Sequence, residues 1–303
     1  MRNTRKKVLV FATEVTYGVD AIAAAEPSVG VLGRNVKITP MAGENSKLDY
    51  DDGTLGNAPE LATEVFGTVE FEVDWAGSGT AGTAPAWAPL MNACLRKTVE
   101  TAGTSSVHSI DDTATDSLTF YFYQDGVLHA FVGARGTFKL KAEAKSFPSL
   151  MFTFTGLFVA PLAAAAAAQD FSVWKKPHKV GVEFSSCVLG GQAAKVISLE
   201  YDQANQVVHA EYVGHEEVEI TDFQPTAKLV LEADTLAGFD PFTAAKDGTE
   251  LAIQFTHGVA GNQVQWESSR VQLGRPTYGD KDGTLTYEIP LIPVSDVDTF
   301  TCL

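Results

Sequence analysis

The sequence has few cysteines, no long hydrophobic run and few basic residues relative to its acidic ones. Its three cysteines, Cys94, Cys187 and Cys302, lie far apart in 303 residues. This spacing supports neither a disulfide framework nor a zinc site, and it fits folding in a reducing compartment. No stretch reaches the roughly 18 apolar residues of a membrane helix. The basic N-terminus precedes an apolar run too short for a secretory signal, so we expect no membrane location.

The charge balance excludes several classes of function. Acidic residues outnumber basic ones by 38 to 22, a formal net charge of −16. Proteins that grip nucleic acid through its phosphates carry the opposite sign, so no tight DNA- or RNA-binding surface is expected. The excess is concentrated, because residues 41–75 and 200–234 each hold nine acids and one lysine. The rest of the chain is neutral.

No motif in the chain supports catalysis or cofactor binding. Gly77–Gly82 fits G-x-G-x-x-G, but the preceding strand alternates with acids and no βαβ series follows. Asp49, Asp51 and Asp52 precede Gly53 without the residue order of an EF-hand. The histidines lack metalloprotease spacing, and there is no G-x-S-x-G elbow. We therefore expect a protein that is not an enzyme and that uses neither a cofactor nor a metal.

A period of two dominates the hydrophobic pattern. In Thr68–Trp75 apolar residues alternate with Glu70, Glu72 and Asp74, which indicates a half-buried strand. A helix is expected near Trp87–Leu95, where apolar residues follow helical spacing. Further strands are expected at Leu118–Tyr123, Val127–Val132, Gly136–Ala142 and Ser149–Val159.

The second half of the chain repeats the pattern of the first. Thr226–Glu232 matches Thr68–Asp74 in hydrophobic pattern, and Asp240–Ala245 is a short helix candidate that follows it. Later strands match when 133 is added to the residue number, which pairs Phe154 with Tyr287. We therefore expect a mainly β protein of two tandem β-sandwich or partial-barrel domains, each with one flanking α-helix. The expected parts are an N-terminal arm at 1–30, a first domain at 31–161, an Ala-rich linker at 162–173 and a second domain at 174–303. Two generic β-rich halves are the alternative.

Met41–Phe66 lacks periodicity and is expected to be a long loop, and the repeat assigns Glu200–Phe223 as its counterpart in the second half. Structureless segments of this length in compact domains are usually functional or disordered.

One part of the sequence resembles a known family. Trp75–Leu95 reads Trp-Ala-Gly-Ser-Gly-Thr-Ala-Gly-Thr-Ala-Pro-Ala-Trp-Ala-Pro-Leu-Met-Asn-Ala-Cys-Leu. This resembles major tail (tail tube) proteins of long, non-contractile-tailed bacteriophages, in which a strand ending near such a run leads into a helix. The resemblance extends to Glu14–Asp20 and Val36–Pro40 and covers about the first 160 residues. The second half lacks this signature and joins the family only through the repeat.

The resemblance implies a structural protein of the virion tail. Subunit sheets would join edge to edge into a closed β-barrel ring, and rings would stack into a tube for genome delivery. A duplicated chain points to trimeric rings with pseudo-sixfold symmetry. The implied partners are further copies of the chain, a tape-measure protein, a tail terminator and a distal tail protein, with double-stranded DNA passing through without sticking. Assembly is expected in the host bacterial cytoplasm.

Acidic positions in the two charged segments are the candidate functional residues. An acidic bore repels phosphates and lets DNA slide. Candidates for the bore lining are Glu70, Glu72, Asp74, Glu232 and Thr286. Candidates in loops that reach a neighbouring ring are Asp49, Asp51, Asp52, Glu60, Glu211, Glu216 and Glu217. The alternatives are acids that face outer solvent and loops that are merely mobile. The alternative function is a fibre, baseplate or decoration protein that binds a host surface or the capsid.

Overall fold

The computed structural model describes residues 3–51, 53, 55–236, 238–294 and 298–303. The chain is mainly β, as expected. The first half contains β1 (Lys7–Thr13), β2 (Ser28–Gly30), β3 (Arg34–Ala42), β4 (Asn45–Lys47), β5 (Glu60–Ala62), β6 (Phe66–Asp74), α1 (Ala88–Asn92), β7 (Arg96–Thr101), β8 (Ser105–Ile110), β9 (Leu118–Gln124), β10 (Val127–Glu143), β11 (Ser149–Phe158) and β12 (Leu162–Ala163).

The second half contains β13 (Ser185–Leu189), β14 (Gln192–Ala193), β15 (Val196–Asp202), β16 (Asn205–Tyr212), β17 (His215–Phe223), β18 (Thr226–Glu232), α2 (Pro241–Asp247), β19 (Glu250–His257), β20 (Val264–Leu273), β21 (Thr277–Lys281), β22 (Thr284–Pro293) and β23 (Asp298–Cys302). Helix α2 begins where its sequence directs. Asp240 accepts hydrogen bonds from the backbone N–H groups of Phe242 and Thr243, and Gly248 ends the helix in a left-handed conformation.

The two halves contain the same series of antiparallel strand pairs. The order across the first half is β2-β1-β9-β10-β11-β6-β3. The order across the second half is β14-β13-β19-β20-β22-β18-β15. The two series correspond strand for strand, and this repeated topology agrees with the repeat in the sequence. Strand β21 extends the line of β20 along β22.

The register of the repeat differs from the sequence match. Val73 pairs with Leu150, and in the second half Leu231 pairs with Tyr287. With Leu231 as the counterpart of Val73, which the match of Thr226–Glu232 with Thr68–Asp74 requires, Tyr287 takes the place of Leu150, four residues from its expected match with Phe154. Because four is an even shift, every side chain keeps its face of the sheet, which is why hydrophobic alternation could not reveal the error.

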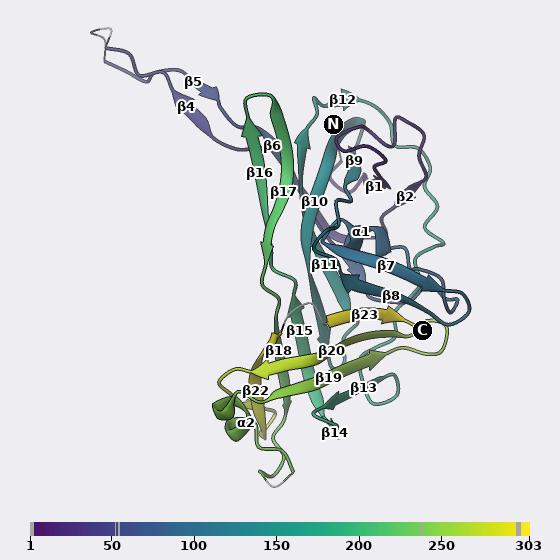
Figure 1. Ribbon diagram of the computed structural model, residues 1–303. Coiled ribbons are helices and arrows are strands. Elements are labelled where there is room, and N and C mark those ends of the chain that lie inside the picture. The colour runs from purple at the N-terminus through teal and green to yellow at the C-terminus, as the bar shows by residue number, and fades with distance from the viewer. Residues whose placement is uncertain (1–2, 52, 54, 237, 295–297) are drawn as a thin grey trace.

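The halves are joined by two strand pairs. The end of β10 pairs with β15, and β8 pairs with β23. Strand β10 therefore belongs to the sheets of both halves, and the buried apolar side chains form one core cluster that extends across them. Among the described strands the pairings never return to their starting strand, so the sheets stay open-ended (Figure 1). The domain boundaries stay predictions.

Three segments differ from the sequence expectations. Within the expected N-terminal arm, β1 pairs along its whole length with β9 and buries Leu9 and Phe11, so this part packs on the first half. The two expected loops each contain a β-hairpin, β4–β5 and β16–β17. The Ala-rich segment begins with β12, which pairs with Val127 and Leu128 of β10.

Candidate assembly surfaces

One side of the shared sheet is covered with charged side chains. Along β6, Val69, Phe71 and Val73 are buried, while Glu70 points outward as strand alternation requires. The same outward side continues over β3, β6, β11, β10, β15, β18, β22 and β21. We call the outward residues of these eight strands the charged face.

Four of the five candidates for a bore lining lie on the charged face, whereas Thr286, on the same side of the sheet, is only 2% exposed and is covered by its neighbours. On β6, Glu70, Glu72 and Asp74 lie opposite three residues of β11, which are Thr153, Met151 and Ser149. In the second half, Glu232 lies directly opposite Thr286. Pairing through β10 and β15 places both groups on the same side of one continuous sheet. That this side lines a bore stays a prediction.

Basic side chains on the charged face neutralise several of these acids. Arg34 Nη2 lies 2.7 Å from Asp74 Oδ1 and 3.3 Å from Glu72 Oε1. Lys195 Nζ lies 2.7 Å from Glu232 Oε1. Further pairs across the face join Lys139 with Asp202 and Lys228 with Glu288, both at 2.8 Å. Sequence reasoning missed these bases, although the alternation of Lys139 and Lys141 in an expected strand was a signal for outward cations.

The carboxyl of Asp74 is partly buried beside Arg34 and Glu72. Partial burial raises the pKa of its carboxyl, which the neighbouring Arg34 guanidinium lowers and Glu72 raises again. Glu70, by contrast, is exposed and has no ion pair within the part of the chain that the structure describes. Glu70 is therefore the candidate whose charge is most available to a passing polyanion.

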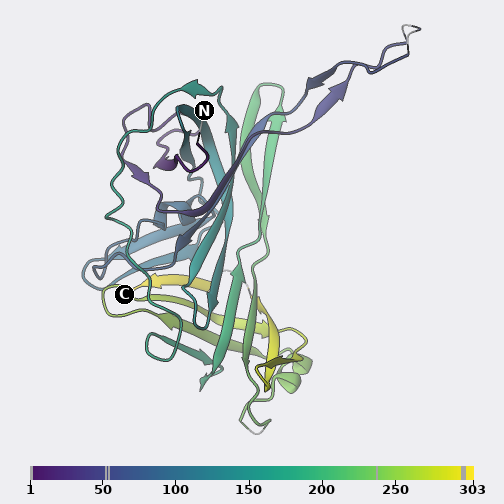
Figure 2. The same ribbon diagram turned by 180° about the vertical axis from the view of Figure 1, so that it is seen from behind.

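The two hairpins in the acidic segments extend from strands of the charged face. The β4–β5 hairpin leaves the ends of β3 and β6 and projects far beyond the body, as both ribbon views show (Figures 1 and 2). The β16–β17 hairpin leaves β15 and β18 toward the same end (Figure 1). Exposed apolar side chains accompany the acids on both hairpins: Tyr50, Leu55 and Leu61 on the first, Tyr212 and Val213 on the second.

The expected inter-ring residues divide between these hairpins. Asp49, Asp51 and Glu60 lie on the β4–β5 hairpin or its tip, whereas Asp52 lies outside the described residues. Glu211, Glu216 and Glu217 lie on β16–β17. Contact with a second ring stays a prediction for all of them.

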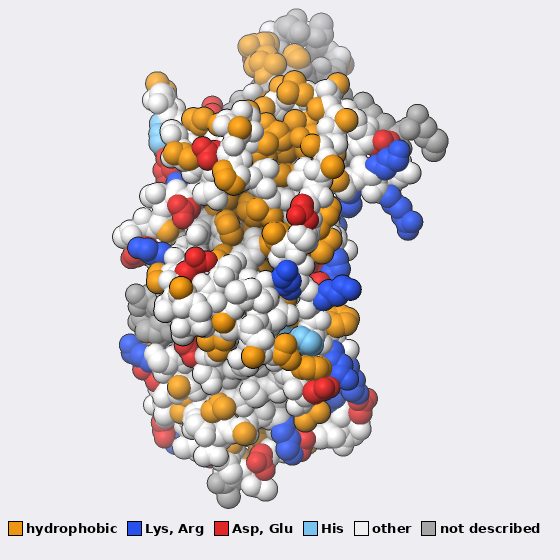
Figure 3. All heavy atoms as spheres, turned by 90° about the vertical axis from the view of Figure 1, so that its right-hand side faces the viewer, with side chains coloured by type: hydrophobic (Ala, Val, Ile, Leu, Met, Phe, Trp, Pro, Cys, Tyr) orange, Lys and Arg blue, Asp and Glu red, His pale blue; other side chains and the backbone are white. Residues whose placement is uncertain are grey.

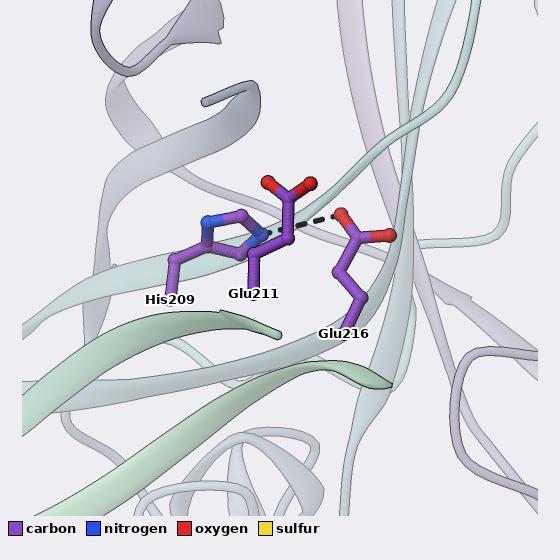
Figure 4. Close-up of side chains that lie close together, drawn as sticks. All are labelled: His209, Glu211 and Glu216. Atoms are coloured by element: carbon purple, nitrogen blue, oxygen red, sulfur yellow. Dashed lines mark hydrogen bonds and ion pairs between the residues drawn. The ribbon is translucent and has the colours of Figure 1, made fainter. Parts of the chain in front are cut away.

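His209 connects the two hairpins. Its Nδ1 lies 3.1 Å from Glu64 Oε1 at the base of β5, and its Nε2 lies 3.2 Å from Glu216 Oε1 (Figure 4). Its ring also packs on Phe66 with centroids 5.3 Å apart. The ligand atoms of His209, Glu211 and Glu216 lie close enough together to hold a cation. Nothing else about the cluster points to a ligand, since each ring nitrogen already has a protein partner.

The side of the molecule that lies on the right in Figure 1 carries an exposed apolar patch. Figure 3 shows hydrophobic side chains gathered on its upper part, over the β1–β2 connection and the Ala-rich segment. Val15 and Val19 of the β1–β2 connection and Leu162 of the Ala-rich segment are exposed.

The motif Gly77–Gly82 does not form a phosphate site, because α1 begins at Ala88, six residues after Gly82, and is only five residues long.

The comparison with protein families agrees with this architecture. The model of a family described as phage tail tube protein matches residues 4–292, nearly the whole chain. The chain belongs to the phage tail tube protein family. The match includes the second half, for which the sequence offered only a weak repeat. No curated protein matches the chain.

Family membership makes the protein a structural component of the virion tail. The described part of the chain holds no helix of the length and apolarity that crossing a bilayer demands.

Proposed function

We propose that this tail tube protein forms three-chain rings whose charged faces line a bore, and that these rings stack into the tube through which DNA leaves the virion. The observation that carries the proposal is the repeated topology. The two halves meet within one chain through β10 and β15, so the same kind of contact between chains would extend the sheet around a ring.

Strand spacing supports three chains rather than two. Eight strands of one chain form the charged face. At about 4.8 Å between strands, two chains give a backbone diameter near 24 Å and three give about 37 Å before any tilt. Side chains take about 10 Å from each, and a DNA duplex is about 20 Å across. A tilt of about 40° widens the two barrels to about 32 and 48 Å, so two chains would leave a bore hardly wider than DNA, whereas three leave ample room.

The projecting hairpins support stacking. Barrel strands run along the axis with a tilt of about 35–45°. A hairpin that continues β3 and β6 therefore leaves the ring at its end and reaches the next ring. Its exposed Tyr50 and Leu55 supply apolar surface to bury there.

The charged face supports passage of DNA without trapping. Arg34, Lys139 and Lys228 are already paired with acids, so these bases offer phosphates little free positive charge, while Glu70 repels them. In this proposal the protein performs no catalysis. Tape-measure, terminator and distal tail proteins contact the tube, and rings assemble in the host bacterial cytoplasm.

Electron microscopy of the purified chain and of virions tests the proposal. We expect tubes of stacked rings with three chains per ring and a central bore. Six chains per ring would overturn the symmetry, and free chains bound to capsids or to host glycans would support a decoration or fibre protein instead.

A further inference from the structure

The contact between neighbouring chains is specified by the contact inside one chain. We propose that β3 of one chain pairs in antiparallel fashion with β21 of the next, with Ile38 opposite Tyr278. This inference rests on the proposed ring, and it adds the strands, the register and the residues that close it.

The internal seam supplies the template. Lys139–Glu143 of β10 pairs with Ser198–Asp202 of β15, and Leu140 lies opposite Tyr201. Both side chains are 1% exposed, so pairing at this seam completes the core.

Strand β3 takes the place of β15 in the first half. Tyr201 pairs with Ala227 on β18, and Ile38 pairs with Val69 on β6. Ala227 and Val69 occupy equivalent positions in the sequence match of Thr226–Glu232 with Thr68–Asp74, which also equates Leu231 with Val73. Ile38 is therefore the counterpart of Tyr201.

Strand β21 takes the place of the end of β10 in the second half. Leu140 pairs with Leu150, and Tyr278 pairs with Tyr287. Since Tyr287 is the counterpart of Leu150, Tyr278 is the counterpart of Leu140. The buried pair Leu140–Tyr201 inside a chain thus corresponds to Tyr278–Ile38 between chains.

Both counterpart strands have an open edge. Within the described residues, β3 pairs only with β6 and β21 only with β22. Tyr278 is 58% exposed, whereas its counterpart Leu140 is buried. Lys7 Nζ donates to the backbone oxygen of Val36 at 2.7 Å, the kind of lysine protection that edge strands receive.

The same register sets the neighbouring pairs on the charged face. Thr39 falls opposite Thr277, and Lys37 falls opposite Gly279. A Cβ at Gly279 would lie 2.9 Å from Glu288 Oε1, so the bare glycine opens a path from Lys37 to that carboxylate. Lys37 of one chain would then lie near Glu288 of the next, beside the Lys228 that already pairs with this acid.

Disulfide trapping tests the register. The three native cysteines are buried, so introduced thiols are the accessible ones. Assembled Ile38→Cys/Tyr278→Cys protein is oxidised with diamide, which accepts the two electrons and two protons released by each thiol pair. On non-reducing gels we expect bands of two and three chains and nothing larger, because a closed ring has no free edge. Thr39→Cys/Thr277→Cys repeats the test in the same register.

The matched control is Ala42→Cys/Tyr278→Cys, which moves one thiol three pairing positions, about 10 Å, along β3, because a bulge separates Thr39 from Ala42. This distance exceeds the reach of a disulfide, so no cross-link is expected. If rings form but neither in-register pair cross-links, or the control cross-links equally, the register is wrong and the ring proposal stands. If the unaltered chain forms no rings, the proposed function itself fails.

Discussion

The guanidinium of Arg96 and the carboxylate of Asp298 lie 2.7 Å apart, and neither side chain is exposed. Arg96 belongs to β7 in the first half and Asp298 to β23 in the second. Arg96 Nη2 also donates to the Tyr201 hydroxyl at 2.8 Å and to Gln203 Oε1 at 2.7 Å. Burial opposes the charge of Arg96, but Asp298 and Tyr201 outweigh it and raise the arginine pKa. The internal seam is therefore held by a buried polar network as well as by strand pairing.

Removing one partner of this pair should destabilise the chain strongly. Arg96→Met leaves Asp298 buried and unpaired, and we expect a loss of about 3–5 kcal/mol in the free energy of unfolding. Arg96→Met combined with Asp298→Leu should lose clearly less, because no isolated charge is left inside. Urea denaturation of both variants measures the difference. Equal losses in the single and double variants would show that the pair is not coupled.

Mild acid should weaken the fold through a buried histidine. Burial and the nearby Arg96 charge lower the pKa of His108 to about 3. The unfolded chain has a histidine pKa near 6.5, so the neutral ring contributes its full stability above about pH 6.5 and loses it as the pH falls. Between pH 7 and pH 4.5 we expect a loss of roughly 2 kcal/mol from this site.

Denaturation curves at several pH values check the prediction. His108→Asn should show a shallower dependence on pH than the parent chain. A parent-like slope in His108→Asn would contradict the assignment.

The tip of the β4–β5 hairpin should control stacking but not ring formation. Replacing residues 48–59 with a short Gly-Ser turn removes Tyr50 and Leu55 and leaves β3 and β6 intact. We expect single rings and few tubes by electron microscopy and sedimentation. A control with Asp49→Asn and Asp51→Asn in the intact hairpin separates the loss of apolar surface from the loss of charge. Normal tubes from the shortened hairpin would show that it does not join rings.

Reversing charge on the charged face should slow DNA without preventing assembly. Glu70→Lys adds a free cation, and Glu72→Lys also releases Arg34 from one of its two acids. We expect tubes of normal shape and slower or incomplete DNA ejection, with an effect that weakens at high salt because charges are screened. Asp112→Lys, in the turn after β8, is the matched control. Unchanged ejection would place Glu70 and Glu72 away from the bore.

The sequence predicted the outward positions of the acids well and the extent of pairing poorly. Alternation in Thr68–Trp75 directly reports which side chains share a face, so Glu70, Glu72 and Asp74 lie where expected. The short helix candidate Asp240–Ala245 likewise corresponds to α2. Both signals are local.

Features that depend on distant strands were not predictable from local patterns. The pairing of β8 with β23 joins residues almost two hundred positions apart, and no periodicity encodes it. Arg34 neutralises Glu72 and Asp74 only because β3 lies beside β6. The offset of the repeat was missed because a shift of four residues preserves alternation.

The pairing of β10 with β15 also bears on how fast a ring can assemble. Because both strands belong to one polypeptide, this seam forms at the high effective concentration of a tethered contact and does not depend on how many chains are present. In a ring of three chains, half of the equivalent seams are therefore already made before any two chains collide. In the proposed ring, the repeat within each chain reduces the number of polypeptides that must meet from six to three.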